Sequence, residues 1–82
     1  MEVDEALYIR MRKWALKCAH KYKFAIPNKV IARILREFPQ LEDEKKELMD
    51  EVRKVCTEVN KMKDAEIASE LEQSGDETII FE

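Results

Sequence analysis

The stretch LYIRMRKWALKCAHKY, Leu7 to Tyr22, decides the fold of this chain. Its apolar residues recur every three or four positions, which places them along one side of an α-helix. The residues on this side are Leu7, Met11, Trp14, Ala15, Cys18 and Tyr22. Asp4 precedes the stretch and predicts an N-cap, so we expect a helix from about Asp4 to Tyr22. A helix with such an apolar side is stable only when that side packs against other segments.

Two prolines divide the chain after this helix. Proline cannot sit inside a helix, but it is favoured at the first helical position, where its missing N–H would have no partner anyway. Pro27 therefore predicts a second helix from Pro27 to Phe38, and Pro39 ends that helix and opens the next one. The apolar side of the second helix consists of Val30, Ile31, Ile34, Leu35 and Phe38.

The third helical segment carries an apolar repeat of the heptad kind. Its members are Leu48, Val52, Val55, Val59 and Met62. The seam spans about two heptads and fits either an intramolecular helix pair or a contact between two copies of the chain. We expect the chain to turn between Asn60 and Lys63, with Asp64 capping a short fourth helix that Ser74 and Gly75 end.

Composition and patterning together predict an all-α fold: a small bundle of three main helices, a short fourth helix and a flexible C-terminal tail. Of the 82 residues 45% are hydrophobic and 40% are charged, a mixture typical of folded helical proteins. A chain of this length forms one domain, which we place at residues 1–73, with the tail at 74–82. The expected core residues are Leu7, Met11, Trp14, Cys18, Ile31, Ile34, Leu35, Leu48, Val52, Val55 and Val59.

No sequence motif predicts catalysis or metal binding. Glycine-rich phosphate loops and the HExxH zinc motif are absent, and His20 has no cysteine or carboxylate at metal-ligand spacing. Cys18 and Cys56 form no CxxC pair, so we interpret them as buried thiols, which a disulfide would join only if their helices placed them face to face. We expect no cofactor, no metal and no enzymatic activity of the chain by itself. The acidic N-terminus and the lack of a long apolar run predict a cytoplasmic protein without membrane contact.

Charge is distributed unevenly along the chain. Residues 1–40 carry nine Lys/Arg against four Asp/Glu, whereas residues 41–82 carry six against fourteen. This asymmetry fits an anionic partner, and it fits equally two halves of one bundle that attract each other. The candidate nucleic-acid-binding residues are the basic residues opposite the apolar sides of the first two helices. They are Arg10, Lys13, Lys17, Lys21, Lys29, Arg33 and Arg36.

Aromatic and apolar residues outside the expected core add further candidate surfaces. Tyr22 and Phe24 stand beside Lys21 and Lys23, and aromatic rings next to cations are suited to stacking on unpaired bases. Ile9 and Leu16 lie off the apolar side of the first helix, where they either meet solvent singly or touch a second surface. As an exposed pair they are candidate partner-docking residues, together with Ile79, Ile80 and Phe81 in the tail. The tail sequence DETIIFE fits a flexible end, a linker cut short, a strand added to a partner's sheet, or a segment folded back on the bundle.

Three segments are similar to the motifs of one family. KWALKCA at 13–19, PNKVIARILREFPQL at 27–41 and VRKVCTEVNKM at 52–62 are similar to KYALxNA, NPxAVIGKVLxExPELR and IVEEVNSM. In the last two segments the matched positions are Val30, Ile31, Leu35, Glu37, Pro39, Leu41, Glu58, Val59, Asn60 and Met62. The chain thus resembles, over about residues 8–72, the helical N-terminal extension of archaeal-type glutamyl-tRNA synthetases.

The resemblance implies a supporting role in translation. The synthetase signatures HIGH and KMSKS are absent, Cys18 replaces a usual asparagine, Ala32 replaces a usual glycine, and KYKFAI lacks the glycines of the family's HGGKA. We therefore predict a non-catalytic accessory domain that contacts tRNA or docks on the body of the synthetase. The alternative is a helical protein-interaction module without a nucleic-acid role, which forms a homodimer through the seam of the third helix or binds a partner through its tail.

Overall fold

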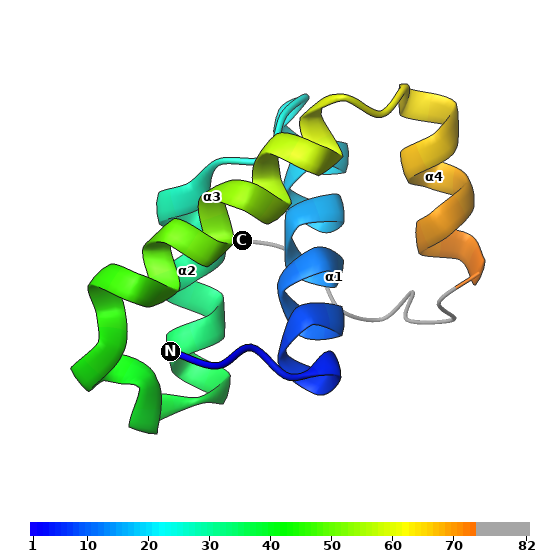
Figure 1. Cartoon of the computed structure of the whole chain (residues 1–82). Coiled ribbons are helices and arrows are strands. Elements are labelled where there is room, and N and C mark those ends of the chain that lie inside the picture. The colour runs from blue at the N-terminus through cyan, green and yellow to red at the C-terminus, as the bar shows by residue number, and fades with distance from the viewer. Residues whose placement is uncertain (74–82) are drawn as a thin grey trace.

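The computed structural model describes residues 1–73, so the tail predicted at 74–82 lies outside the described residues. It contains four α-helices, α1 (Glu5–Tyr22), α2 (Pro27–Glu37), α3 (Lys45–Asn60) and α4 (Asp64–Gln73), and a short 3-10 helix, η1 (Pro39–Glu44). Figure 1 shows α1 between the α2–α3 pair and α4. The prediction of an all-α fold with three main helices and a short fourth is confirmed. Within residues 1–73, no helix combines the length and apolarity needed to cross a membrane.

Local signals place the ends of α1 and the start of α2. The Asp4 carboxylate accepts a hydrogen bond from the Leu7 N–H at 2.8 Å, which confirms the predicted N-cap. Lys23 ends α1 in a left-handed conformation with φ of 77°, which costs a non-glycine residue roughly 1–2 kcal/mol. Pro27 occupies the start of α2. A backbone N–H at this position has no partner within the helix, so the missing N–H of proline costs no hydrogen bond.

Two helix starts differ from the sequence-based expectation. Pro39 opens the 3-10 helix η1 instead of an α-helix, and α3 begins only at Lys45. The tighter 3-10 turn keeps Leu41 packed against the core. In α4 the first helical residue is Asp64 itself, and the Glu66 carboxylate accepts a hydrogen bond from the Lys63 N–H at 2.9 Å, as in a capping box.

One hydrophobic core connects all four α-helices, with α1 at its centre. Ten of the eleven predicted core residues are buried, and the remaining one, Leu35, is partly buried and packs against the core. The core is wider than predicted because α4 covers a second side of α1. Leu16 and Ala19 on that side and Ile67 of α4 are each 3–4% exposed.

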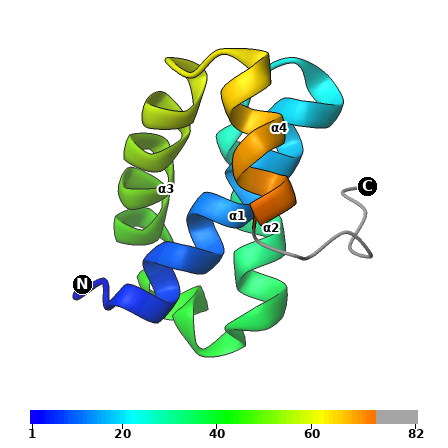
Figure 2. The same ribbon diagram turned by 90° about the vertical axis from the view of Figure 1, so that its right-hand side faces the viewer.

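The heptad-like seam of α3 packs inside the chain. Leu48, Val52 and Val59 have no exposed surface, and Val55 is 3% exposed. Figure 2 shows α3 and α2 on opposite sides of α1, and these three helices pack on one another. The prediction of an intramolecular helix pair is therefore confirmed. A homodimer through this seam is wrong for the folded bundle, because four of its five residues are already buried and Met62 is partly buried.

Ion pairs join the basic and acidic halves of the chain. The Arg12 guanidinium donates two hydrogen bonds to the Glu70 carboxylate, at 2.7 and 3.0 Å, and so holds α4 on α1. Its third nitrogen lies 3.5 Å from the Glu58 carboxylate of α3, which also accepts a hydrogen bond from the Tyr8 hydroxyl at 2.9 Å. The hydrogen bonds from Arg12 to Glu70 raise the pKa of the guanidinium, which thus stays charged. The charge asymmetry predicted that the basic and acidic halves of the chain could attract each other, and these ion pairs between them are present in the fold.

Cys18 and Cys56 are free thiols within this core. Burial raises the pKa of both thiols above its ordinary value, and that of Cys56 reaches about 12. The neighbouring Cys18 also contributes to the raised pKa of Cys56. The thiolate form that nucleophilic attack and metal binding need is therefore disfavoured at neutral pH.

Candidate nucleic-acid interface

The structure divides the predicted basic residues into those used within the bundle and those left at its surface. Arg10 belongs to the first group, because it is ion-paired with Glu37 at the end of α2. Lys17 also belongs there: it is only 8% exposed, so the prediction that it lies on the outer side of α1 is wrong. A lysine has a long apolar stem that packs along its neighbours, and helical periodicity does not reveal this.

The contacts around Trp14 explain why Arg10 and Arg33 pack closely against the bundle. The Trp14 indole N–H donates a hydrogen bond to the Glu37 carboxylate at 2.8 Å. The guanidinium carbons of Arg10 and Arg33 lie 5.8 and 5.6 Å from the centre of the indole ring, within the range of cation–π attraction. These contacts fasten α2 to α1. Both arginines therefore have a structural role whether or not they bind a ligand.

Basic residues gather on the outer side of α2. Lys29, Arg33 and Arg36 line one shallow hollow together with Asn28 and Ala32. Lys29 and Arg36 are exposed, and neither forms an ion pair within residues 1–73. Exposed cations around a hollow attract phosphate groups because binding releases the counterions of the nucleic acid.

The C-terminal end of α1 continues this basic surface. The ammonium groups of Lys21 and Lys29 lie 5.4 and 4.8 Å from the centre of the Tyr22 ring. Lys21 of α1 and Lys29 of α2 are thus brought to one aromatic side chain. Lys13, further back along α1, is partly exposed.

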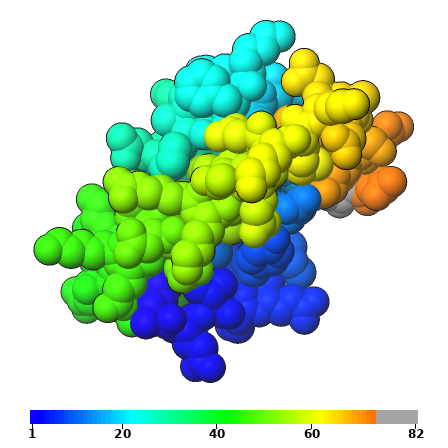
Figure 3. Space-filling model, turned by 45° about the horizontal axis from the view of Figure 1, so that its top comes forward, coloured from blue at the N-terminus to red at the C-terminus, as the bar shows by residue number. Residues whose placement is uncertain are grey.

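Sequence reasoning missed the lysines that α3 brings to this end of the bundle. Figures 1 and 3 show the loop after α1 beside the turn after α3. Asn60 joins the two segments: its side-chain oxygen accepts from the Ala25 N–H at 2.7 Å, and its amide nitrogen donates to the Ala25 carbonyl at 3.2 Å. Lys61 and Lys63, from the acidic half of the chain, therefore lie at the same end as Lys23. We call this surface the basic end; it consists of Lys21, Lys23, Lys29, Lys61 and Lys63.

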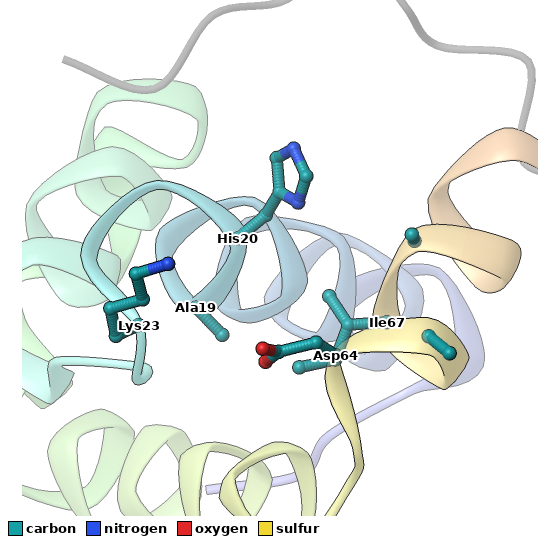
Figure 4. A pocket seen from close by; sticks show the side chains of 7 residues that line it. Ala19, His20, Lys23, Asp64 and Ile67 are labelled. Atoms are coloured by element: carbon teal, nitrogen blue, oxygen red, sulfur yellow. The ribbon is translucent and has the colours of Figure 1, made fainter.

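A hollow beside the basic end lies between α1 and α4. Figure 4 shows its lining residues Ala19, His20, Lys23, Asp64 and Ile67. Asp64 and Lys23 contribute opposite charges, and the rest of the lining is largely apolar. In the described part of the chain, no group of three or more His, Cys, Asp or Glu side chains is placed to hold a metal ion.

The two predicted docking residues of α1, Ile9 and Leu16, line one hollow between α1 and α4 but differ in exposure. Ile9 is 51% exposed, as a surface residue should be. Leu16 is 3% exposed, so the expectation that it forms an exposed pair with Ile9 is wrong; α4 covers it. Ile79, Ile80 and Phe81 lie outside the described residues. A docking role for Ile9 stays a prediction.

The fold and these surfaces define a class: a small helical bundle that presents cations at one end and along one helix. In comparison with known proteins, the chain is similar to a glutamate–tRNA ligase of Methanopyrus kandleri, with 42% identity over 66 residues. The match covers 79% of this chain and 12% of the ligase. No protein-family model and no solved structure matches the chain. The chain is therefore a bundle similar to one segment of a glutamate–tRNA ligase.

Proposed function

We propose that this chain is a non-catalytic accessory domain of the archaeal glutamate–tRNA ligase type, equivalent to the helical N-terminal extension of such an enzyme. It supports aminoacylation in the cytoplasm by contacting tRNA through the basic end and the outer side of α2. The identity of 42% over 66 residues supports the relation to the ligase. The lysines at the basic end support the contact with tRNA, because phosphate is the ligand that such a surface attracts.

The domain contributes binding in this proposal, and another part of the enzyme contributes catalysis. The chain spans only 12% of the ligase that it resembles. Its own sequence lacks the HIGH and KMSKS signatures. An accessory domain that holds one part of a large substrate helps to position the reacting part elsewhere.

Two positions matched to the family motifs have structural roles that fit this relation. Glu37 accepts hydrogen bonds from Trp14 and Arg10 and so fastens the end of α2 to α1. Asn60 holds the loop after α1 against the end of α3 through both backbone groups of Ala25. These two matched residues hold helices in place, which supports a shared fold for the matched segments.

The observation that most supports tRNA contact is a set of exposed lysines that form no ion pair within the described bundle. Arg12 is bound to Glu70, whereas Lys23, Lys61 and Lys63 are exposed and form no ion pair within residues 1–73. Each exposed lysine that reaches a phosphate releases condensed counterions, so its contribution depends steeply on salt. We therefore assign tRNA contact to the basic end and the outer side of α2 rather than to the buried Lys17.

A titration with unfractionated tRNA at several salt concentrations tests the proposal. We expect log Kd to rise linearly with log salt concentration, as it does when phosphate contacts dominate binding. Reversing Lys23 and Lys61 to glutamate should weaken binding at low salt by about tenfold or more and make the salt dependence shallower. Reversing Lys45 and Lys46 is the matched control, because these exposed lysines begin α3 at the end remote from Asn60.

Two results would contradict tRNA contact at this surface. One is the absence of tRNA binding by the wild-type chain at low salt. The other is an equal loss in the control variant and in the variant of the basic end, which would indicate a nonspecific effect of net charge. If tRNA does not bind but a purified ligase body co-elutes with the chain, docking on the synthetase replaces tRNA contact as its function.

A further inference from the structure

A phenylalanine at the basic end has a larger exposed fraction than any other large hydrophobic residue among residues 1–73. Phe24 is 55% exposed, and it follows Lys23 in the loop after α1. The next residue, Ala25, is only 2% exposed. A single exposed hydrophobic residue is ordinary in a folded protein, so its exposure alone predicts no function. The backbone contacts around Phe24 and the charge of the surface beside it provide the further argument.

Side-chain hydrogen bonds hold the backbone from the Phe24 carbonyl to the Ile26 N–H. The Cys18 thiol donates a hydrogen bond to the Phe24 carbonyl at 3.8 Å and accepts one from the Ile26 N–H at 3.4 Å. Asn60 binds both the N–H and the carbonyl of Ala25. The ring is therefore presented from a backbone that is already ordered. Ordering costs part of the free energy of any binding event, and a preformed loop lowers this cost.

The charge around the ring favours RNA over a protein partner. Residues 20–36, which include the loop after α1 and most of α2, and residues 59–63 at the end of α3 contain no acidic residue; Asp64 follows them and lies with Lys23 at the hollow between α1 and α4. Lysine is depleted around the aromatic anchors of protein–protein interfaces. Sites for single-stranded nucleic acid, in contrast, combine cations that follow the backbone with aromatic rings on which bases stack.

We propose that Phe24 stacks on an unpaired base of the bound RNA while lysines of the basic end contact the neighbouring phosphates. This inference rests on the proposed function and adds the kind of RNA element that the surface takes: a single-stranded loop or end. The faces of bases inside a duplex are covered by their neighbours, whereas those of a single strand are accessible to a protein ring. Phe24 thus selects unpaired RNA, and the lysines supply affinity without sequence preference.

The test compares two RNA probes and three variants of Phe24. The probes are a short single-stranded oligouridylate and an RNA duplex of the same length. Phe24→Ala and Phe24→Leu should weaken single-strand binding by about fivefold or more, while Phe24→Trp, which keeps an aromatic face, should retain it. Duplex binding should be unchanged in all three variants. The salt dependence of single-strand binding should also be unchanged, because the ring carries no charge.

The outcomes separate this inference from the proposed function. If the wild-type chain binds neither probe nor tRNA at low salt, the proposed tRNA contact itself fails. If it binds the single strand and Phe24→Ala binds equally well, only the stacking role is overturned. Wild-type affinity in Phe24→Leu would also overturn stacking, because leucine keeps apolar contact but has no aromatic face. Circular-dichroism melts of each variant are the control for folding. We expect each variant to be folded, because the change affects an exposed side chain.

Discussion

Replacing Asn60 by alanine tests how the basic end is held together. Asn60 is the last residue of α3, and its side chain makes hydrogen bonds of 2.7 and 3.2 Å to the N–H and carbonyl of Ala25. With Asn60 in place Ala25 is only 2% exposed, so these two backbone groups depend on the Asn60 side chain for their hydrogen bonds. A buried polar group left without a partner costs about 1–3 kcal/mol.

The expected loss follows from these two contacts. With two groups affected and partial relaxation of the loop, Asn60→Ala should lower the free energy of unfolding by roughly 2–4 kcal/mol. In a domain of this size each kcal/mol corresponds to about 4–8 °C in Tm. Asn60→Asp keeps an acceptor for the Ala25 N–H and loses the donor to its carbonyl, so we expect about half of this loss. Thr57→Ala, on the exposed side of α3, is the control and should change stability by less than about 0.5 kcal/mol.

Guanidinium-induced unfolding, followed by Trp14 fluorescence and by circular dichroism, measures these differences. A loss of less than about 0.5 kcal/mol for Asn60→Ala would refute the structural role of these two hydrogen bonds, because losing both should cost more than this. That result would also remove the support for a fixed backbone after Phe24. The same variants should bind tRNA more weakly if the loop after α1 has to be ordered to form the basic end.

Two further predictions concern the core. Trp14→Phe removes the indole N–H that donates a hydrogen bond to Glu37 at 2.8 Å. The free energy of unfolding, measured by chemical denaturation, should fall by about 1–3 kcal/mol. Equal stability would show that this hydrogen bond does not help to fasten α2. The pKa of Cys56 is raised from 9.0 to about 12, so the folded state keeps its proton where the unfolded state loses it. The stability that this thiol contributes is present below pH 9 and falls as the pH rises towards 12. In that window the stability of the wild type should therefore decline more steeply than that of Cys56→Ala. Parallel pH profiles of the two proteins would contradict the raised pKa of Cys56.

The helices and most of the core could be predicted from the sequence because their signals are local. The spacing of apolar residues, the Asp4 cap and the missing N–H of Pro27 each act within one or two turns of helix. For this reason α1 and α2 begin where the pattern indicates. Leu7, Met11 and Trp14 are buried as predicted, because one apolar side of a helix faces one core.

The available charges could not be predicted in the same way. A sequence pattern shows which side of a helix is polar, but it does not show which other segment will cover that side. The sequence predicted Lys17 at the surface, and the fold buries it; it predicted Leu16 at the surface, and α4 covers it. Conversely, the KMK segment at 61–63 stands in the acidic half of the chain, and Asn60 brings it to the loop after α1.

By itself, the sequence determined that this chain is a helical bundle and which residues form its centre, since helix periodicity and capping depend on neighbours along the chain. Only the tertiary structure decided which cations bind carboxylates within the bundle and which remain exposed together at one end. The physical reason is that ion pairing and burial depend on distances between segments far apart in sequence. Arg12 meets Glu70 in this way, and Lys23 lies at the same end as Lys61.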